Sequence, residues 1–215
     1  MRERIQRDER SVVFVVDDDF RVREGLSSLL SAEGLRVMAF GAAAEFLQSE
    51  KPDAPACLVL DLELPGIDGL ELQQELSGGD APPIVFITGH GDIPSSVRAM
   101  KAGAIEFLLK PFAAEDLLKA VRTGIALDRS AREKRSELAE LRKRYSLLTA
   151  REKEVMPLVV AGYANKQTAS ILGVAEITVA VHRGQIMRKL GVRSFAELVR
   201  MADRLGIAPA PENPI

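Results

Sequence analysis

The sequence predicts an α/β domain with a doubly wound, five-stranded parallel sheet, followed by an all-α domain of four helices. Two observations carry this prediction. Short apolar, β-branched runs alternate with helically spaced apolar residues through the first 125 residues, and such alternation produces a parallel sheet with helices on both faces. Residues 146–207, in contrast, contain only helical spacings. A chain of 215 residues with 47% hydrophobic content is long and apolar enough for both domains.

The five strands are predicted where apolar residues run without interruption, as in strands buried on both faces. These runs cover residues 12–16, 36–40, 57–60, 84–87 and 105–109. Helical spacing of apolar residues lies between them, at residues 22–30, 43–47, 70–76 and 97–101. In a sheet of this kind the functional site lies beyond the carboxyl ends of the strands.

The net charge of −2 hides an asymmetry between the two halves. Residues 1–125 hold 13 Lys and Arg against 21 Asp and Glu, a net of −8, whereas residues 126–215 hold 16 against 10, a net of +6. This division predicts an acidic half that handles cations or phosphate and a basic half that meets a polyanion, with chance fluctuation as the alternative.

The remaining composition predicts a cytoplasmic protein with no membrane contact. The single cysteine, Cys57, excludes a disulfide framework and a Cys-based zinc site. Apolar stretches fall short of the about 18 residues that a membrane span needs. The charged start of the sequence lacks the apolar segment of a secretory signal.

Polar side chains follow four of the predicted strands. Asp17, Asp18 and Asp19 follow the first strand, Asp61 ends the third, Thr88 the fourth and Lys110 the fifth. Carboxylates gathered at one edge repel one another, and a hard divalent cation bound through oxygen, with magnesium favoured, relieves that repulsion. A carboxylate nucleophile, a metal, an amine and a hydroxyl together suit the oxygens of a phosphoryl group.

Four motifs in this half resemble the receiver domain of two-component response regulators. They are VVDDDF (15–20), DLELPGIDG (61–69), TGHGDIP (88–94) and KPF (110–112). The resemblance covers about residues 11–128 and implies a flavodoxin-like, CheY-like sheet of strand order 2-1-3-4-5. It also implies that the Lys110–Pro111 peptide bond is cis, which would aim the lysine at the site.

The same resemblance assigns roles to individual residues. Asp61 would accept a phosphoryl group from a histidine kinase. Mg²⁺ or Mn²⁺ would be held by Asp17, Asp18, Asp61 and the backbone carbonyl of Glu63. Lys110 would pair with the phosphoryl oxygens, Thr88 would hydrogen-bond one of them, and Phe107 would turn inward when Thr88 moves.

Some of these residues have simpler alternatives. Asp19 stands where a helix N-cap or first-turn acid would stand, and Phe107 has the alternative of an ordinary core residue. His90 is interpreted as a loop residue and not as a ligand. The Glu63 side chain borders the site, so we expect it to affect how fast the phosphoryl group arrives or leaves.

From residue 114 the sequence predicts a long helix that continues through a linker at 129–145, with Gly124 as the one interruption. The mixed charges between 128 and 144 indicate a solvated face. Leu138, Leu141, Tyr145 and Leu148 form an apolar stripe, for which a short coiled coil between two copies is the alternative use.

Residues 146–207 predict four helices with recognisable ends. Thr149 with Glu152, and Ser194 with Glu197, have the spacing of a capping box. A second helix at 165–174 ends at Gly173, and a third at 177–190 follows after a short turn, which is helix-turn-helix spacing. Pro157 is expected to kink the first helix. The proline-containing residues 208–215 are expected to form a disordered tail.

The motifs LTAREKEVM (148–156), GYANKQTA (162–169), TVAVHR (178–183) and MRKLGV (187–192) resemble the LuxR-type helix-turn-helix of the FixJ/NarL family. The TGHGDIP loop resembles the FixJ and StyR subgroup. The resemblance implies that residues 176–189 enter the major groove of DNA. Residues expected at the DNA are Lys166, Arg183 and Lys189 on phosphates, Thr178, Ala180, Val181 and Gly184 facing the bases, and His182 beside the backbone.

This chain departs from its relatives on the groove-facing side. Ala180 stands where relatives often have a charged residue, and with Val181 and Gly184 it leaves few hydrogen-bond donors. Contact with thymine methyls, or recognition of DNA shape, is therefore expected to carry more of the specificity.

The predicted function is a transcription regulator and not an enzyme. A sensor histidine kinase phosphorylates Asp61, the receiver pairs with a second copy through the helix after the fourth strand, the fifth strand and the next helix, and the dimer binds promoter DNA and meets RNA polymerase. One alternative, a hydrolase of the haloacid dehalogenase type, has its nucleophile on the first strand, whereas Asp61 ends the third. The other is a receiver that ignores phosphorylation and serves as a constitutive DNA-binding or docking protein.

Overall fold

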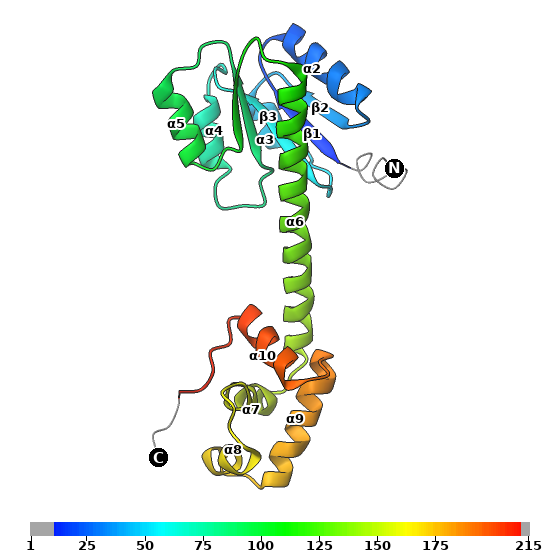
Figure 1. Cartoon of the computed structure of the whole chain (residues 1–215), viewed down its shortest axis with the longest axis vertical. Coiled ribbons are helices and arrows are strands. Elements are labelled where there is room, and N and C mark those ends of the chain that lie inside the picture. The colour runs from blue at the N-terminus through cyan, green and yellow to red at the C-terminus, as the bar shows by residue number, and fades with distance from the viewer. Residues whose placement is uncertain (1–10, 212–215) are drawn as a thin grey trace. The chain divides into compact units, whose positions relative to one another are not determined.

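The computed structural model describes residues 11–211, and the chain divides into two compact units between Arg132 and Glu133. We call residues 11–132 the N-terminal unit and residues 133–211 the C-terminal unit (Figure 1). Helix α6, Ala114–Ser146, runs unbroken through the predicted end of the first domain and the predicted linker. Its first turns belong to the N-terminal unit and its last turns to the C-terminal unit.

The N-terminal unit contains a five-stranded sheet with the predicted order β2-β1-β3-β4-β5, and every pair is parallel. Its strands are β1 (Val12–Val16), β2 (Arg36–Phe40), β3 (Ala56–Asp61), β4 (Ile84–Thr88) and β5 (Glu106–Leu109). The doubly wound fold class is confirmed. Burial on both faces holds for β1, β3 and β4 but not for β2 and β5, because these two strands lie at the edges of the sheet.

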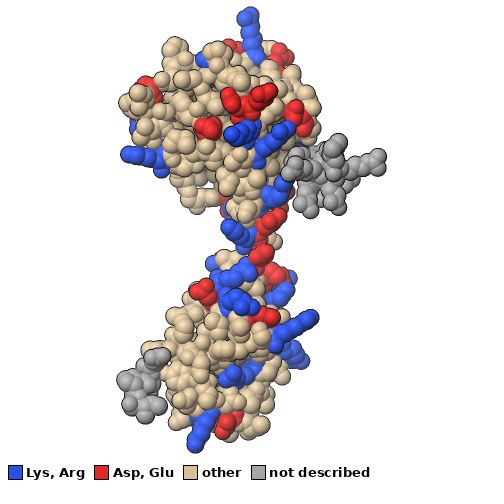
Figure 2. Space-filling model, viewed as in Figure 1, with Lys and Arg blue, Asp and Glu red and all other residues tan. Residues whose placement is uncertain are grey.

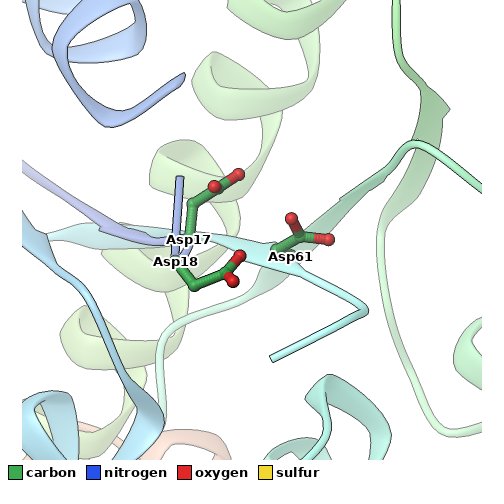
Figure 3. A group of neighbouring side chains, drawn as sticks. All are labelled: Asp17, Asp18 and Asp61. Carbon is green, nitrogen blue, oxygen red and sulfur yellow. The ribbon is translucent and has the colours of Figure 1, made fainter. Parts of the chain in front are cut away.

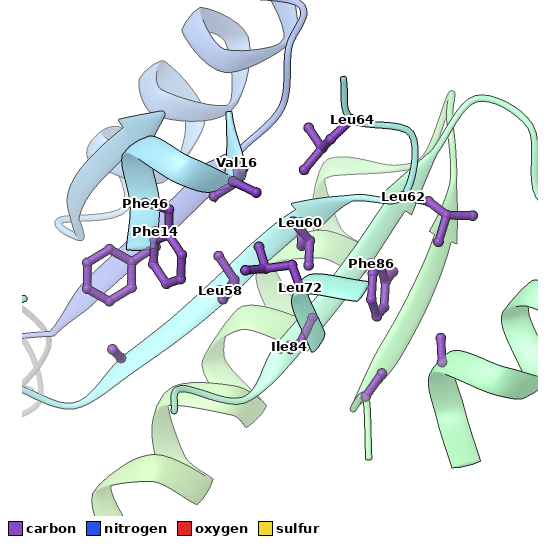
Figure 4. Close-up of a cluster of buried hydrophobic side chains, with 14 of the residues drawn as sticks. Phe14, Val16, Phe46, Leu58, Leu60, Leu62, Leu64, Leu72, Ile84 and Phe86 are labelled. Carbon is purple, nitrogen blue, oxygen red and sulfur yellow. The ribbon is translucent and has the colours of Figure 1, made fainter. Parts of the chain in front are cut away.

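Helices cover both faces because successive side chains of a strand point to opposite sides. Phe14 and Val16 of β1 join the first core with Phe46, Leu72 and other residues from α3 (Ala43–Gln48), α4 (Gly69–Glu75) and α5 (Ile93–Lys101) (Figure 4). Val13 and Val15 join a second core with α2 (Phe20–Ala32) and the start of α6. Helices therefore pack against both faces of the sheet.

The start of α6 lies directly on β3. A Cβ atom at Gly124 would stand 2.6 Å from the Cys57 sulfur, so glycine permits the close approach. One turn later the buried Asp128 carboxylate accepts the Ala56 N–H at 2.8 Å and the Arg132 Nε–H at 2.8 Å. Burial, together with the charge of Asp128, raises the pKa of Cys57 to about 12, so the thiol stays protonated at neutral pH.

The C-terminal unit contains the four predicted helices and the last turns of α6. They are α7 (Ala150–Val160), α8 (Asn165–Leu172), α9 (Glu176–Leu190) and α10 (Phe195–Arg204). Leu141, Tyr145 and Leu148 pack into the core of this unit. Three of the four residues of the predicted apolar stripe therefore pack inside this unit, and the coiled coil between copies stays a prediction.

The helix ends follow the sequence closely. Thr149 and Glu152 form the predicted capping box, and Gly173 ends α8 with φ 66°. Ser194 accepts the Glu197 N–H, but the Glu197 carboxylate takes the Arg193 N–H in place of the N-cap amide.

Two expectations about proline fall in this unit. Helix α7 continues through Pro157, whose carbonyl accepts the Ala210 N–H at 3.1 Å. The Tyr163 hydroxyl donates to the Pro211 carbonyl at 2.8 Å. The described part of the tail, residues 208–211, has no helix or strand, but these two hydrogen bonds attach it to the domain. Residues 212–215 of the expected disordered tail lie outside the described residues.

Within residues 11–211, no helix is long and apolar enough to cross a membrane.

Candidate functional site

The carboxyl ends of β1 and β3 bring three carboxylates together at one edge of the sheet. We call Asp17, Asp18 and Asp61 the acidic cluster (Figure 3). One oxygen from each lies within 4.8 Å of the others. Asp17 and Asp61 are buried and Asp18 is exposed, so the cluster opens to solvent at Asp18.

Lys110 supplies positive charge to this cluster. Its ammonium lies 2.7 Å from Asp17 Oδ2 and 2.7 Å from Asp61 Oδ2. The Lys110 N–H donates to the Thr88 carbonyl at 2.8 Å, and the Lys110–Pro111 peptide bond is cis. The Lys110 ammonium lies beside the ends of β1 and β3.

Burial and neighbouring charges shift the pKa values of Asp17 and Lys110 in opposite directions. Burial raises the pKa of Asp17, and the hydrogen bond and charge of Lys110 offset this rise only in part. Burial also disfavours the charged lysine, but the hydrogen bonds and charges of Asp17 and Asp61 outweigh it and raise the pKa of Lys110. The ammonium is therefore retained at neutral pH.

Backbone amides orient the two buried carboxylates. Asp17 Oδ1 accepts the Asp19 N–H at 2.9 Å, and Asp61 Oδ1 accepts the Glu63 N–H at 3.2 Å. The Arg23 guanidinium donates to the carbonyls of Asp17 and Asp18. Asp19 is the N-cap of α2 and accepts the Arg21 N–H, so the simpler alternative for this residue is confirmed.

Thr88 and Phe107 lie beside this site on β4 and β5. Thr88 is buried, and its hydroxyl accepts the His90 N–H at 3.1 Å. Phe107 is half-buried, with its ring 6.2 Å from the ring of Phe86. The exposed His90 and Glu63 side chains face each other, 3.6 Å from Nδ1 to Oε2.

The acidic cluster fits a hard divalent cation. Carboxylate oxygens are the ligands that Mg²⁺ prefers, and one or two of them suffice because Mg²⁺ keeps several waters. The exposed Asp18 leaves a solvent-facing side for those waters. A bound cation would neutralise charge on the carboxylates and on an incoming phosphoryl group.

In the C-terminal unit, α8 and α9 are joined by the short turn at residues 173–175, which is a helix-turn-helix arrangement. Val179, Ile186 and Leu190 form the buried stripe of α9. Lys166 is exposed on the first turn of α8, and Val181 is exposed on α9. Figure 2 shows Lys and Arg side chains distributed over the visible face of this unit.

Gly184 is exposed as well, whereas the remaining predicted DNA contacts, Ala180 among them, are less exposed. Thr178, His182 and Arg183 are half-buried, and the Arg183 guanidinium lies 3.4 Å from the Tyr163 carbonyl. The Lys189 ammonium donates to Glu152 Oε2 at 2.7 Å, which joins α9 to α7. Burial opposes the charge of Glu152, but the bonds from Lys189 and the Thr149 N–H outweigh it and lower its pKa. No local pattern in the sequence indicated this pair, whose members are 37 residues apart.

Comparison with known proteins agrees with both parts of this geometry. Residues 13–122 match the response regulator receiver domain, and residues 146–202 match the bacterial regulatory proteins of the luxR family. Nodulation protein W of Bradyrhizobium diazoefficiens is 50% identical over 200 residues, which cover 93% of this chain and 88% of that protein. Transcriptional regulatory protein FixJ of Azorhizobium caulinodans is 45% identical over 203 residues, 93% of this chain and 95% of that one.

A solved structure of the response regulator StyR is 50% identical, with a TM-score of 0.82, and the match covers 91% of this chain and 99% of that chain. A parallel sheet with an acidic cluster and a lysine at its carboxyl edge, joined to a helix-turn-helix, defines a response regulator that acts on transcription. The chain belongs to the two-component response regulators that join a receiver domain to a LuxR-type DNA-binding domain, and its relatives include FixJ. This family consists of DNA-binding regulators, not enzymes, and it implies a cognate kinase and promoter DNA as partners.

Proposed function

We propose that phosphorylation of Asp61 by a sensor histidine kinase controls promoter binding by this regulator. The observation that carries the proposal is the Asp61 carboxylate at the sheet edge, 2.7 Å from the Lys110 ammonium and beside Asp17 and Asp18. An Asp61 oxygen would attack the phosphorus of a phosphohistidine, the P–N bond would break, and the imidazole would leave with its electron pair.

Charge stabilisation would come from groups already in place. Lys110 would bind the phosphoryl oxygens as they gain charge. Asp17, Asp18, Asp61 and the Glu63 carbonyl would hold Mg²⁺ or Mn²⁺, which supplies further positive charge. The Glu63 side chain, on the solvent side of the site, would affect the rate at which the phosphoryl group arrives or leaves.

The phosphoryl group would then change the surface around α5 and β5. It adds roughly 1.5 to 2 negative charges and new acceptor oxygens, so the Thr88 hydroxyl would donate to it and release the His90 N–H. A Cβ atom at Gly91 would stand 2.4 Å from Leu109 and 3.1 Å from Phe107. The loop after Thr88 therefore touches β5, and its movement would be passed to Phe107.

The affected surface is apolar enough to pair two copies. Ile93, Val97 and Met100 of α5 are exposed at helical spacing, and Leu109 of β5 is exposed as well. We infer that phosphorylation promotes a homodimer through α5, β5 and the start of α6. Two copies of α9 would then meet two half-sites of a promoter.

On the DNA, Lys166 and Arg183 would contact phosphates, Thr178 and Val181 would face the bases, and His182 would lie beside the backbone. Lys189 would contribute less to phosphate binding, since its ammonium is bound to Glu152. The protein would act in the cytoplasm, with RNA polymerase as a further partner.

The first test is the intact mass of the whole protein after incubation with acetyl phosphate and Mg²⁺, with Asp61→Asn as the control. We expect one phosphoryl adduct on the wild type and none on the variant, together with tighter promoter binding by the phosphorylated protein. If phosphorylation leaves DNA binding unchanged, or if Asp61→Asn leaves promoter activity in a reporter strain unchanged, the result would instead indicate a constitutive DNA-binding protein.

A further inference from the structure

The outward face of α9 is defined by its buried face. Successive residues of an α-helix turn by about 100°, and the buried stripe of Val179, Ile186 and Leu190 fixes the inward direction. The residues on the opposite side form one ridge, which we call the outer ridge: Ile177, Val181, Gly184 and Arg188. This ridge is the part of α9 that would enter deepest into a groove.

The first two turns of the outer ridge are apolar. Ile177 is 72% exposed and Val181 is 55% exposed, and they are four residues apart on the same face. Gly184 and the neighbouring Ala180 add no polar group. Arg188 stands at the other end of the ridge, where its guanidinium donates to the Gln185 side chain at 2.5 Å.

The charges around this ridge identify what would cover it. Residues 165–193 hold five basic residues and one acidic residue, which favours a polyanion over a second apolar protein surface. In the major groove of DNA, the apolar group presented to a protein is the 5-methyl group of thymine. Guanine and adenine are instead recognised through hydrogen-bonding side chains, which Ile177 and Val181 do not have.

We propose that Ile177 and Val181 determine the DNA sequence preference of this regulator by packing against thymine methyl groups. The inference rests on the proposed DNA-binding function and adds the chemistry of base recognition to it. The preferred half-site would contain thymines at the two positions that face these side chains. Phosphate contacts from Lys166 and Arg183 would supply affinity without sequence preference.

Replacing thymine with uracil tests the proposal directly. Uracil pairs with adenine and keeps the same major-groove acceptor, but it lacks the methyl group. We would select preferred duplexes from a random pool with the phosphorylated full-length protein, and then measure affinity for duplexes in which one thymine at a time is uracil. At a contacted position we expect affinity to fall about fourfold, the equivalent of exposing one methyl-sized group.

Two variants and a control connect the effect to these residues. Val181→Ala should lose the uracil effect at one position, and Ile177→Ala at another. Leu147→Ala, an exposed apolar residue outside α9 that is 62% exposed, should keep both effects. Because all three side chains are on the surface, we expect their thermal unfolding to match that of the wild type.

The outcomes separate this inference from the proposed function. Sequence-selective binding with no uracil effect at any thymine would overturn the methyl contact and leave the proposed function standing. A uracil effect that persists unchanged in both Val181→Ala and Ile177→Ala would overturn the assignment to these residues. A wild-type protein that selects no DNA sequence would contradict the proposed function and this inference together.

Discussion

The two units each bury charged side chains, but the balance of charge differs between them. In the receiver, Asp17 and Asp61 share the ammonium of Lys110, and Asp18 lies beside them. In the C-terminal unit, Glu152 faces Lys189, one charge against one. A cluster with surplus negative charge is relieved by a cation, whereas a matched pair needs no further ligand. We infer from this comparison that the first cluster serves binding, whereas the second joins α9 to α7.

The largest expected effect follows from removing Lys110. Lys110→Met would leave two buried carboxylates without their ammonium, and we expect the free energy of unfolding to fall by about 3 kcal/mol in the presence of a chelator. Mg²⁺ should restore part of this loss because it replaces the missing positive charge. Urea unfolding with and without Mg²⁺ measures both quantities.

Asp61→Asn is the matched control for that experiment. It removes one negative charge from the same cluster, so we expect its stability in chelator to equal or exceed that of the wild type. A Lys110→Met protein as stable as the wild type without metal would show that the acidic cluster carries no surplus charge to relieve.

Lys189→Met examines the balanced pair. The change leaves Glu152 buried without its partner, and we expect a loss of about 2 kcal/mol in the unfolding free energy that Mg²⁺ does not restore. The double variant with Glu152→Gln should recover part of the loss, since it removes both charges. If Lys189→Met weakens DNA binding while unfolding is unchanged, its ammonium acts on DNA and not on Glu152.

The same pair predicts a dependence on pH. Because the pKa of Glu152 is lowered in the folded protein, its contribution is complete above the unfolded value of about 4.3 and is lost as pH falls through the folded value. Glu152→Gln should therefore flatten the acid side of the stability curve of the wild type. Curves that remain parallel over that range would contradict the lowered pKa.

Local patterns in the sequence were sufficient for the strands, for the helix caps and for the residues at the strand ends. Apolar runs mark strands, and parallel strands bring their carboxyl ends to one edge, so Asp17, Asp61 and Lys110 had to meet. Whether a strand lies at an edge of the sheet is not encoded in its own run, so the runs alone overestimated the burial of β2 and β5. The strand order implied by the family resemblance does place both strands at the edges.

Contacts between distant segments were beyond the reach of such patterns. Asp128 and Ala56 are 72 residues apart, and their contact depends on how α6 packs on β3. The stripe of Leu138, Leu141, Tyr145 and Leu148 has a periodicity that suits a coiled coil and a domain core equally. Periodicity identifies the buried face of a helix, but the partner of that face is decided by tertiary packing.

The smallest expected effect on stability is that of Lys166→Ala. This variant distinguishes a lysine that contacts DNA from one that is paired inside the protein. Lys166 is exposed on the first turn of α8, so Lys166→Ala should change the unfolding free energy by less than about 0.5 kcal/mol. If the lysine binds a phosphate, its loss should weaken binding to all DNA sequences alike and reduce the slope of log affinity against log salt by about 0.9 per subunit. Titrations at several salt concentrations measure this slope, with Lys189→Met as the comparison. An unchanged slope for Lys166→Ala would remove it from the DNA interface, whereas a slope altered in both variants would assign Lys189 a phosphate contact in addition to its bond with Glu152.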